Sequence, residues 1–228
     1  MNCTHSAGIC LLACSLIGGL ASVSAGQTST GRPPAEARVP SFAGPSGLLL
    51  APTAGVQRGG EASVWIAGRD RVSGGVVVGV ANRAELGVVA GSGDGRTRVD
   101  AHAKLVVLPE QLVTPGLAIG IVNAGGVGVG ERSGYVVARK TIIPYFVQAA
   151  GGPEHIAVKL SAGFGDGLFH RRPFGGVEIV HGSGVSAIGE LVSGRVNAGV
   201  RYVHGPWAAT AGWIGNQGVV SVSGVVRW

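Results

Sequence analysis

Cysteine, aromatic residues and charge are all scarce in this chain. Its only cysteines are Cys3, Cys10 and Cys14, all within the first 25 residues. Disulfides and thiolate metal sites are therefore excluded from everything that follows. Charged residues make up 13% of the sequence and aromatic residues 5%. Basic clusters with interleaved aromatic residues are missing, which argues against a nucleic-acid partner.

Sequence signatures of enzymes and metal proteins are missing as well. The histidines after residue 25 show no H-x-H or HxxxH spacing, so they do not predict a metal site. No G-x-S-x-G motif occurs. The glycines of 125–130 lack the spacing of a dinucleotide-binding loop. We therefore expect a non-enzymatic protein, with no catalytic, cofactor-binding or metal-binding residues and no cofactor.

Helical periodicity is absent, whereas glycine and period-two alternation are abundant. The chain has 42 glycines in 228 residues, far above the roughly 7% of a typical globular domain. Residues 195–202 alternate polar with apolar side chains, and residues 218–228 repeat the pattern. Alternation of this period predicts strands with one apolar and one polar face.

Turn signals divide the chain into about twelve such strands. They cover residues 61–68, 74–80, 84–90, 96–107, 116–123, 134–142, 156–164, 174–180, 185–192, 194–202, 207–214 and 218–228. Antiparallel outer-membrane barrels usually have an even number of strands. The sequence therefore predicts an all-β fold, an antiparallel up-and-down transmembrane β-barrel.

The N-terminal 25 residues indicate export. Residues 7–20 are apolar or small, and Val23-Ser24-Ala25 is typical of a signal-peptide cleavage site. The apolar run is too short for a spanning helix, which needs about 20 such residues. Leu11-Leu12-Ala13-Cys14 also resembles a lipobox, so lipidation at Cys14 is an alternative to cleavage after Ala25.

Two further regions follow the signal peptide 1–25. Residues 26–43 are polar and contain three prolines, Pro33, Pro34 and Pro40, which predicts a flexible leader. Residues 44–228 contain no second linker and are expected to form the single β-barrel domain.

A secreted soluble β-protein that binds glycan or a protein partner is the alternative, because its strands would alternate too. The C-terminal pattern Val220, Val222, Val226 and Trp228 is similar to the strand signature that barrel-assembly machinery recognises. That similarity and the consistently apolar strand faces favour the membrane barrel. Two features count against it: few aromatic residues, and many runs of seven to nine residues where about 9–11 are needed to span.

Isolated charges within otherwise apolar strands form a candidate network. Glu85, Glu178 and Glu190 would be costly facing lipid, so we expect them to face the lumen and to pair with arginines such as Arg195 or Arg201. A structural network and a ladder that contacts a substrate are the two interpretations. The net charge of +6 is also compatible with a lumen that favours anions or acidic polysaccharide.

The densest basic spot in the sequence is His170-Arg171-Arg172, which precedes Pro173. We expect it on a loop, either as a solvated turn or as a contact for anionic glycan or lipopolysaccharide.

The segment after the leader resembles the opening of a known family. Residues 44–54, GPSGLLLAPTA, are similar to the G-x-TGLI-x-x-PTA opening of YjbH-like outer-membrane β-barrel proteins, with Ser46 where threonine is usual. Four later segments resemble the family in the same order, at 84–87 (AELG), 174–178 (FGGVE), 188–191 (IGEL) and 197–202 (NAGVRY). The resemblance implies a bacterial outer-membrane location and a role in exopolysaccharide export or envelope organisation, as a channel or scaffold. Together with the C-terminal pattern and the basic residues, it leads us to expect outer-membrane lipid, lipopolysaccharide, the barrel-assembly machinery and anionic polysaccharide as partners.

The opening motif has two structural interpretations. Gly44 and Gly47 permit turn geometries, Pro52 fixes its own φ, and the motif closes with Thr53. With the apolar residues 48–50 between them, these four could form a plug or strap that closes the barrel. The alternative is a plain first strand with its turn.

Overall fold

The computed structural model describes residues 39–68, 72–93, 96–125, 131–142, 147–149, 152–154 and 156–228. These residues belong to one compact unit, which spans Glu36–Trp228. The expected signal peptide, the lipobox and the leader up to residue 38 lie outside the described residues.

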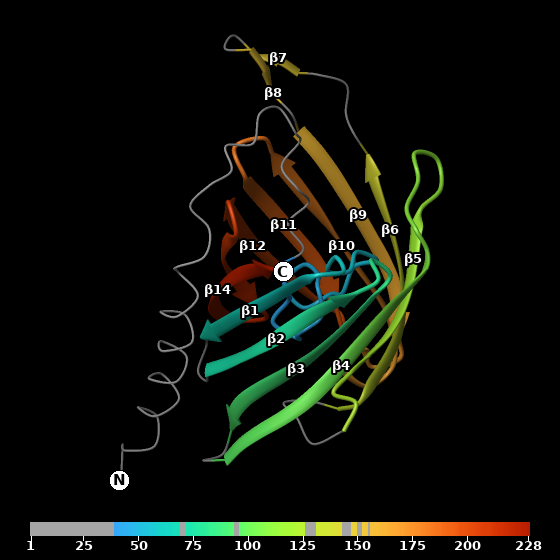
Figure 1. Cartoon of the computed structure of the whole chain (residues 1–228), viewed down its shortest axis with the longest axis vertical. Coiled ribbons are helices and arrows are strands. Elements are labelled where there is room, and N and C mark those ends of the chain that lie inside the picture. The colour runs from blue at the N-terminus through green and yellow to red at the C-terminus, as the bar shows by residue number, and fades with distance from the viewer. Residues whose placement is uncertain are drawn as a thin grey trace. The chain divides into compact units, whose positions relative to one another are not determined.

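Twelve antiparallel strands of the described chain close into a single barrel (Figure 1), so the predicted all-β fold and antiparallel barrel are confirmed. The barrel strands are β1 (Glu61–Gly68), β2 (Val72–Val80), β3 (Ala84–Gly93), β4 (Arg96–Leu108), β5 (Gly116–Val122), β6 (Ser133–Ile142), β9 (Ile156–Gly165), β10 (Arg172–His181), β11 (Val185–Val192), β12 (Arg195–His204), β13 (Trp207–Ile214) and β14 (Gln217–Arg227). Each pairs with its neighbours along the chain, and β1 closes on β14 with Glu61 opposite Arg227.

Between β6 and β9 the chain forms an additional hairpin of β7 (Val147–Ala149) and β8 (Gly152–Glu154), which the sequence pattern did not predict. The described part of the chain also contains one short 3-10 helix, η1 (Gly167–Phe169). None of its helices has the length and apolar character that crossing a membrane would require.

Several barrel strands are longer than the sequence pattern predicted. The predicted strands 84–90 and 174–180 extend to ten residues each as β3 and β10. Glycine, proline and polar residues at their ends hid these extensions, because such residues are typical of turns. The tight turns themselves use left-handed backbone: in the three-residue connection between β2 and β3, Ala81 and Asn82 have φ of 49° and 58°, the positive values that type I′ turns require.

The barrel wall is apolar outside, and its inner face carries charged and polar side chains as well as an apolar cluster. On β12, Val196 and Val200 are 75% and 54% exposed, whereas Asn197 and Arg201 on the other face are 2% and 4% exposed. On β14, Val220 and Val222 point outward, and Ser221 and Ser223 are buried in the lumen. These are the phases that the alternation in the sequence predicts.

The two ends of the barrel differ in what they carry. We call the end where β1 begins and β14 finishes the entry end, and the opposite end, where β1 finishes and β14 begins, the far end. Residues 39–60, which we call the inserted segment, precede β1 and lie within the barrel (Figure 1).

Candidate functional site

The inserted segment folds back on itself inside the lumen. Val39, Leu48 and Leu49 are buried together with residues of the barrel wall. Backbone hydrogen bonds run from Phe42 N–H to the Leu49 carbonyl (2.7 Å) and from Leu48 N–H to the Ala51 carbonyl (2.9 Å). The segment forms only isolated β-bridges and is not a strand of the barrel, unlike the first-strand interpretation. Its fold also includes residues 39–43, which the sequence assigned to the leader.

The four motif residues named from the sequence lie together in this fold. Gly44 has φ of 111°, in the region that favours glycine, and a side chain there would strike the ring of His102. Gly47 packs so closely against the Ala51 carbonyl that no Cβ fits. Pro52 forms an isolated bridge with Gly47, and Thr53 N–H donates to the Ser46 carbonyl at 3.3 Å.

Glu85 of β3 holds one side of the segment. Its carboxylate accepts the Ser46 N–H at 2.8 Å and the Ser46 hydroxyl at 2.7 Å. It also accepts the Gln57 N–H at 3.0 Å. Lys104 of β4 lies 3.0 Å from the same carboxylate and donates to the Ser46 carbonyl at 2.7 Å. The side chains of Glu85 and Lys104 are fully buried, so this ion pair is shielded from water and from salt.

Glu190 of β11 holds the tip of the segment. Its carboxylate accepts three consecutive backbone N–H groups, from Leu49 (3.1 Å), Leu50 (2.9 Å) and Ala51 (3.0 Å). Asn197 of β12 donates a further bond at 2.9 Å. This buried carboxylate thus accepts from four donors, three of which are backbone N–H groups that no strand partner reaches.

Arg201 of β12 binds the turn between these two anchors. Its guanidinium donates to the carbonyls of Gly47 (3.1 Å) and Leu48 (2.8 Å). It also donates to Glu178 of β10 at 3.2 Å. Glu178 in turn lies 3.3 Å from Lys159 of β9, so a cation–carboxylate–cation row lines the wall beside the segment.

The structure thus brings together Glu85, Glu178, Glu190 and Arg201, but not Arg195. Arg195 is exposed at the far end, where it lies against Gly215 instead of any of the three glutamates. It has the inward phase of β12 but stands six residues before Arg201, beyond the lumen. Period-two alternation predicts which face of a strand a residue occupies but not how far along the strand it lies. The sequence pattern therefore could not distinguish Arg195 from Arg201.

Ser46, Gln57, Lys104 and Asn197 belong to the same network, but the sequence did not single them out as site residues. Lys104 had a usable signal, because it alternates in phase with Asp100 and His102 on the predicted strand 96–107. The backbone N–H donors of the inserted segment could not have been predicted, because every residue type except proline carries the same backbone N–H group.

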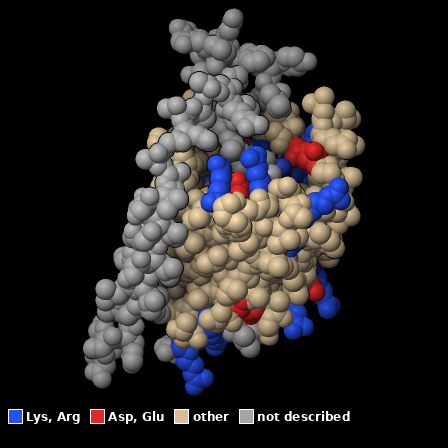
Figure 2. Space-filling model, viewed as in Figure 1, with Lys and Arg blue, Asp and Glu red and all other residues tan. Residues whose placement is uncertain are grey.

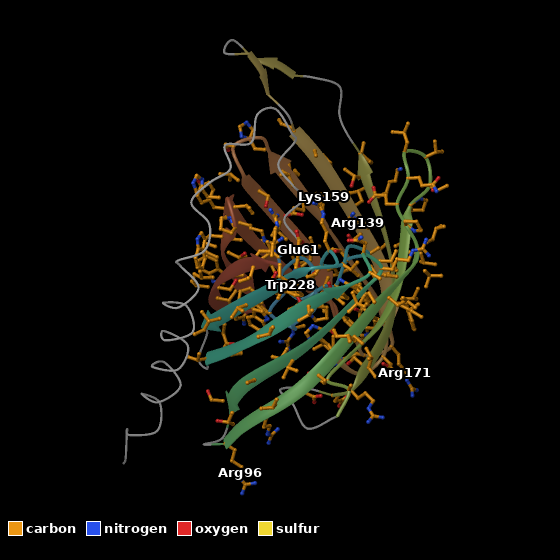
Figure 3. All side chains as sticks on the ribbon, viewed as in Figure 1. Glu61, Arg96, Arg139, Lys159, Arg171 and Trp228 are labelled. Carbon is orange, nitrogen blue, oxygen red and sulfur yellow. The ribbon has the colours of Figure 1, made fainter. Side chains whose placement is uncertain are left out.

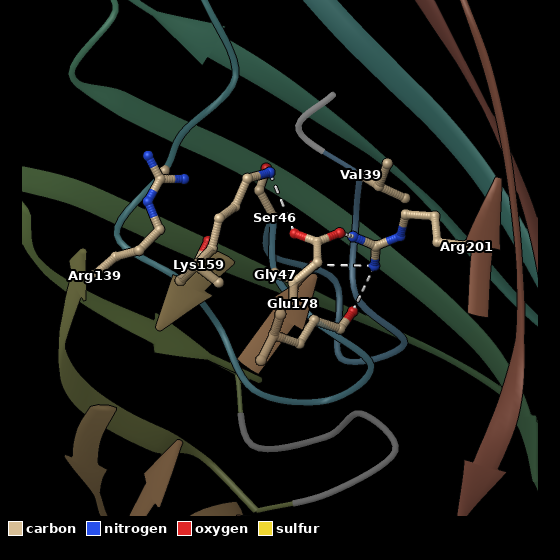
Figure 4. Close-up of a pocket in the computed structure, with 10 residues that line it drawn as sticks. Val39, Ser46, Gly47, Arg139, Lys159, Glu178 and Arg201 are labelled. Carbon is tan, nitrogen blue, oxygen red and sulfur yellow. Dashed lines mark hydrogen bonds and ion pairs between the residues drawn. The ribbon is translucent and has the colours of Figure 1, made fainter. Parts of the chain in front are cut away.

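A small cavity of ≈ 20 Å³ remains between the inserted segment and the wall (Figure 4). That volume admits about one water molecule. The cavity is polar on the wall side and is lined by Val39, Ser46, Gly47, Leu48, Thr53, Gly55, Arg139, Lys159, Glu178 and Arg201.

Glu110, in the loop between β4 and β5, caps the entry end beside this cavity. Its carboxylate accepts the Thr141 N–H and the Arg139 side chain, the latter at 3.0 Å. Burial acts to raise the pKa of Glu110, but the Thr141 N–H and the Arg139 charge outweigh it and hold the pKa below its usual value.

The lumen beyond the segment is filled by apolar side chains. Phe169 and Phe174 stack with ring centroids 4.3 Å apart, and Tyr135 meets Phe169 edge-on at 5.9 Å. These rings form one core cluster with Leu48 and Leu49 of the inserted segment. The segment and the aromatic rings therefore close the interior as a packed core.

Among the described residues, no group of three or more histidine, cysteine, aspartate or glutamate side chains is placed to hold a metal ion. A scan of the sequence against protein-family models gave no match, and a comparison with curated proteins also gave none. The resemblance to YjbH-like barrels therefore stays a prediction.

Proposed function

We propose that this protein is an outer-membrane β-barrel, closed by its inserted segment, that serves exopolysaccharide export or envelope organisation without catalysing a reaction. The observation that carries the proposal is the apolar outer wall around an interior that buries charged and polar side chains beside an apolar core. All barrel strands except β1 contribute at least one large, exposed apolar side chain. A protein in water would lose the hydrophobic stabilisation of this whole surface, whereas a bilayer provides an apolar solvent for it.

Strand length supports the same environment. Eight barrel strands have nine to thirteen residues, and a tilted membrane strand needs about 9–11. The shortfall that the sequence pattern suggested therefore does not apply to most of the wall.

The site favours a scaffold or gated channel over a permanently open pore. Glu85, Glu190 and Arg201 are occupied by the inserted segment, so passage of a solute would require the segment to move. The link to exopolysaccharide rests on the family resemblance. In a gated state, the cations around the cavity would be available to an anionic polysaccharide.

The first test is outer-membrane fractionation of the expressed protein, followed by gel electrophoresis of the detergent extract with and without boiling. We expect the protein in the outer membrane, with a band that shifts on boiling. A soluble periplasmic or extracellular protein whose band does not shift would overturn the barrel proposal and favour the secreted binding protein.

A second test addresses closure. The wild-type protein in planar bilayers should conduct little, while Glu190→Ala should open it because the tip of the segment loses three hydrogen bonds. Glu131→Ala, in an exposed loop, is the matched control and should stay closed. High conductance of the wild type would contradict the closed state.

A further inference from the structure

Exposed arginines surround the far end of the barrel. They lie on four of its hairpins: at the start of β4, before β6, at the start of β10 and at the start of β12. We call this set the arginine rim: Arg96, Arg98, Arg132, Arg171, Arg172 and Arg195. Arg96 and Arg171 mark the lower edge of the barrel in Figure 3, and Figure 2 shows basic residues along that edge.

The charge of the arginine rim is not neutralised within the described chain. None of the six arginines forms an ion pair with a described residue. At the entry end two of the cations are paired: Arg227 lies 2.9 Å from Glu61 and Arg139 lies 3.0 Å from Glu110. The six arginines of the rim are therefore available to attract anions.

The rim also lies at the edge of the apolar wall. Arg98 is followed directly by Val99 and Arg195 by Val196, and both valines point outward and are more than half exposed. One residue of strand advances about 3.4 Å, so the guanidinium groups start within a few ångströms of the apolar band. In a bilayer this is the depth of the lipid headgroups.

Two of the rim side chains extend over turns at the far end of the barrel. The Arg172 guanidinium lies over Gly194 in the turn between β11 and β12, and the Arg195 guanidinium lies near Gly215 in the next turn. Arginine forks match phosphate oxygens in geometry and charge. A row of guanidinium groups at headgroup depth is suited to lipid phosphates. Binding of a soluble polysaccharide would not require an apolar wall beside the arginines.

We propose that the arginine rim binds the phosphate groups of anionic membrane lipids in the leaflet at the far end of the barrel. This inference rests on the proposed function, because it requires the barrel to span a membrane. The bound phosphates would fix the depth and orientation of the barrel and complete its charge balance.

The test reconstitutes the full chain into vesicles of phosphatidylcholine alone and of phosphatidylcholine with phosphatidic acid. The temperature at which the band shifts on heating reports stability. We expect phosphatidic acid to raise it for the wild type and for the entry-end pair Arg58→Gln/Arg83→Gln. The rim pair Arg98→Gln/Arg195→Gln should lose about half of that rise, and high salt should reduce it.

Further outcomes of this experiment distinguish lipid phosphates from soluble anions, and the rim proposal from the membrane-barrel proposal. Equal stabilisation of the rim pair and the entry-end pair would overturn the inference, as would no stabilisation of the wild type. Inorganic phosphate or soluble alginate giving the same rise in phosphatidylcholine vesicles would overturn the assignment to lipid. Failure to float with vesicles would refute the membrane barrel itself, whereas insertion without a preference for phosphatidic acid refutes only the rim.

Discussion

Ser46 and Glu85 are 39 positions apart in the chain and are joined by two hydrogen bonds, one from the Ser46 N–H (2.8 Å) and one from its hydroxyl (2.7 Å). Through this pair the inserted segment is fixed to the barrel wall by both backbone and side chain. A threonine, usual at this position in the family that the motif resembles, would offer the same hydroxyl.

Neutralising Glu85 should destabilise the barrel. Glu85→Gln leaves the buried Lys104 ammonium without its carboxylate, and breaking a buried ion pair typically costs about 3 kcal/mol. The free energy of unfolding in urea, measured in detergent, should fall by that amount. Glu131→Gln removes an exposed carboxylate and should change stability little; equal effects of the two changes would refute the anchoring role of Glu85.

Arg201 and Arg195 lie on the same face of β12, but substitution by lysine should change the stability of the protein differently at the two positions. Arg201→Lys keeps the charge but loses the fork that reaches Gly47, Leu48 and Glu178 at once, at a cost of about 2 kcal/mol. Arg195→Lys should be nearly neutral in the same unfolding assay. A comparable loss for both would mean that the network extends to the far end.

Alanine substitutions at Phe169 and Phe164 compare the stability contribution of a side chain inside the barrel with that of one on its outer wall. Phe169 is fully buried and stacks on Phe174, whereas Phe164 is half exposed on the outer wall. Phe169→Ala should therefore cost about 3–5 kcal/mol, and Phe164→Ala about 0.5 kcal/mol. The reverse order in thermal unfolding would show that the lumen is not the core.

Gly87 leaves room for the buried ring of His102. A Cβ at Gly87 would overlap that ring, so Gly87→Ala should cost about 1–3 kcal/mol through overpacking. In the double variant with His102→Ala the overlap with the ring disappears, while the contact with the Val76 carbonyl, 2.6 Å from such a Cβ, remains. The double-mutant cycle should therefore show a favourable coupling of about 1 kcal/mol. Additive effects would place the ring elsewhere.

Much of the wall could be predicted because strand phase and turns are local. The strands 61–68, 185–192 and 207–214 have the predicted bounds, since alternation and glycine-rich turns delimit them within a few residues. The short β7–β8 hairpin was missed because three-residue strands are too short to show a period.

The contacts inside the lumen could not be predicted in the same way. Glu190 meets the backbone of Leu50 across 140 positions, and no periodicity encodes such a pairing. The arginines posed a related difficulty, because Arg195 and Arg201 share a phase and only the closed barrel fixes which of them reaches the lumen.

The central claim is that the apolar face of the wall meets lipid and the polar face meets the lumen. Single cysteines at residues 219–224 of β14, in a background with Cys3, Cys10 and Cys14 replaced by serine, can be labelled with a fluorophore in reconstituted vesicles. A lipid-soluble quencher should then act with period two, strongly at Val220 and Val222 and weakly at Ser221 and Ser223. Quenching of the two valine positions by a water-soluble quencher instead would contradict the membrane barrel.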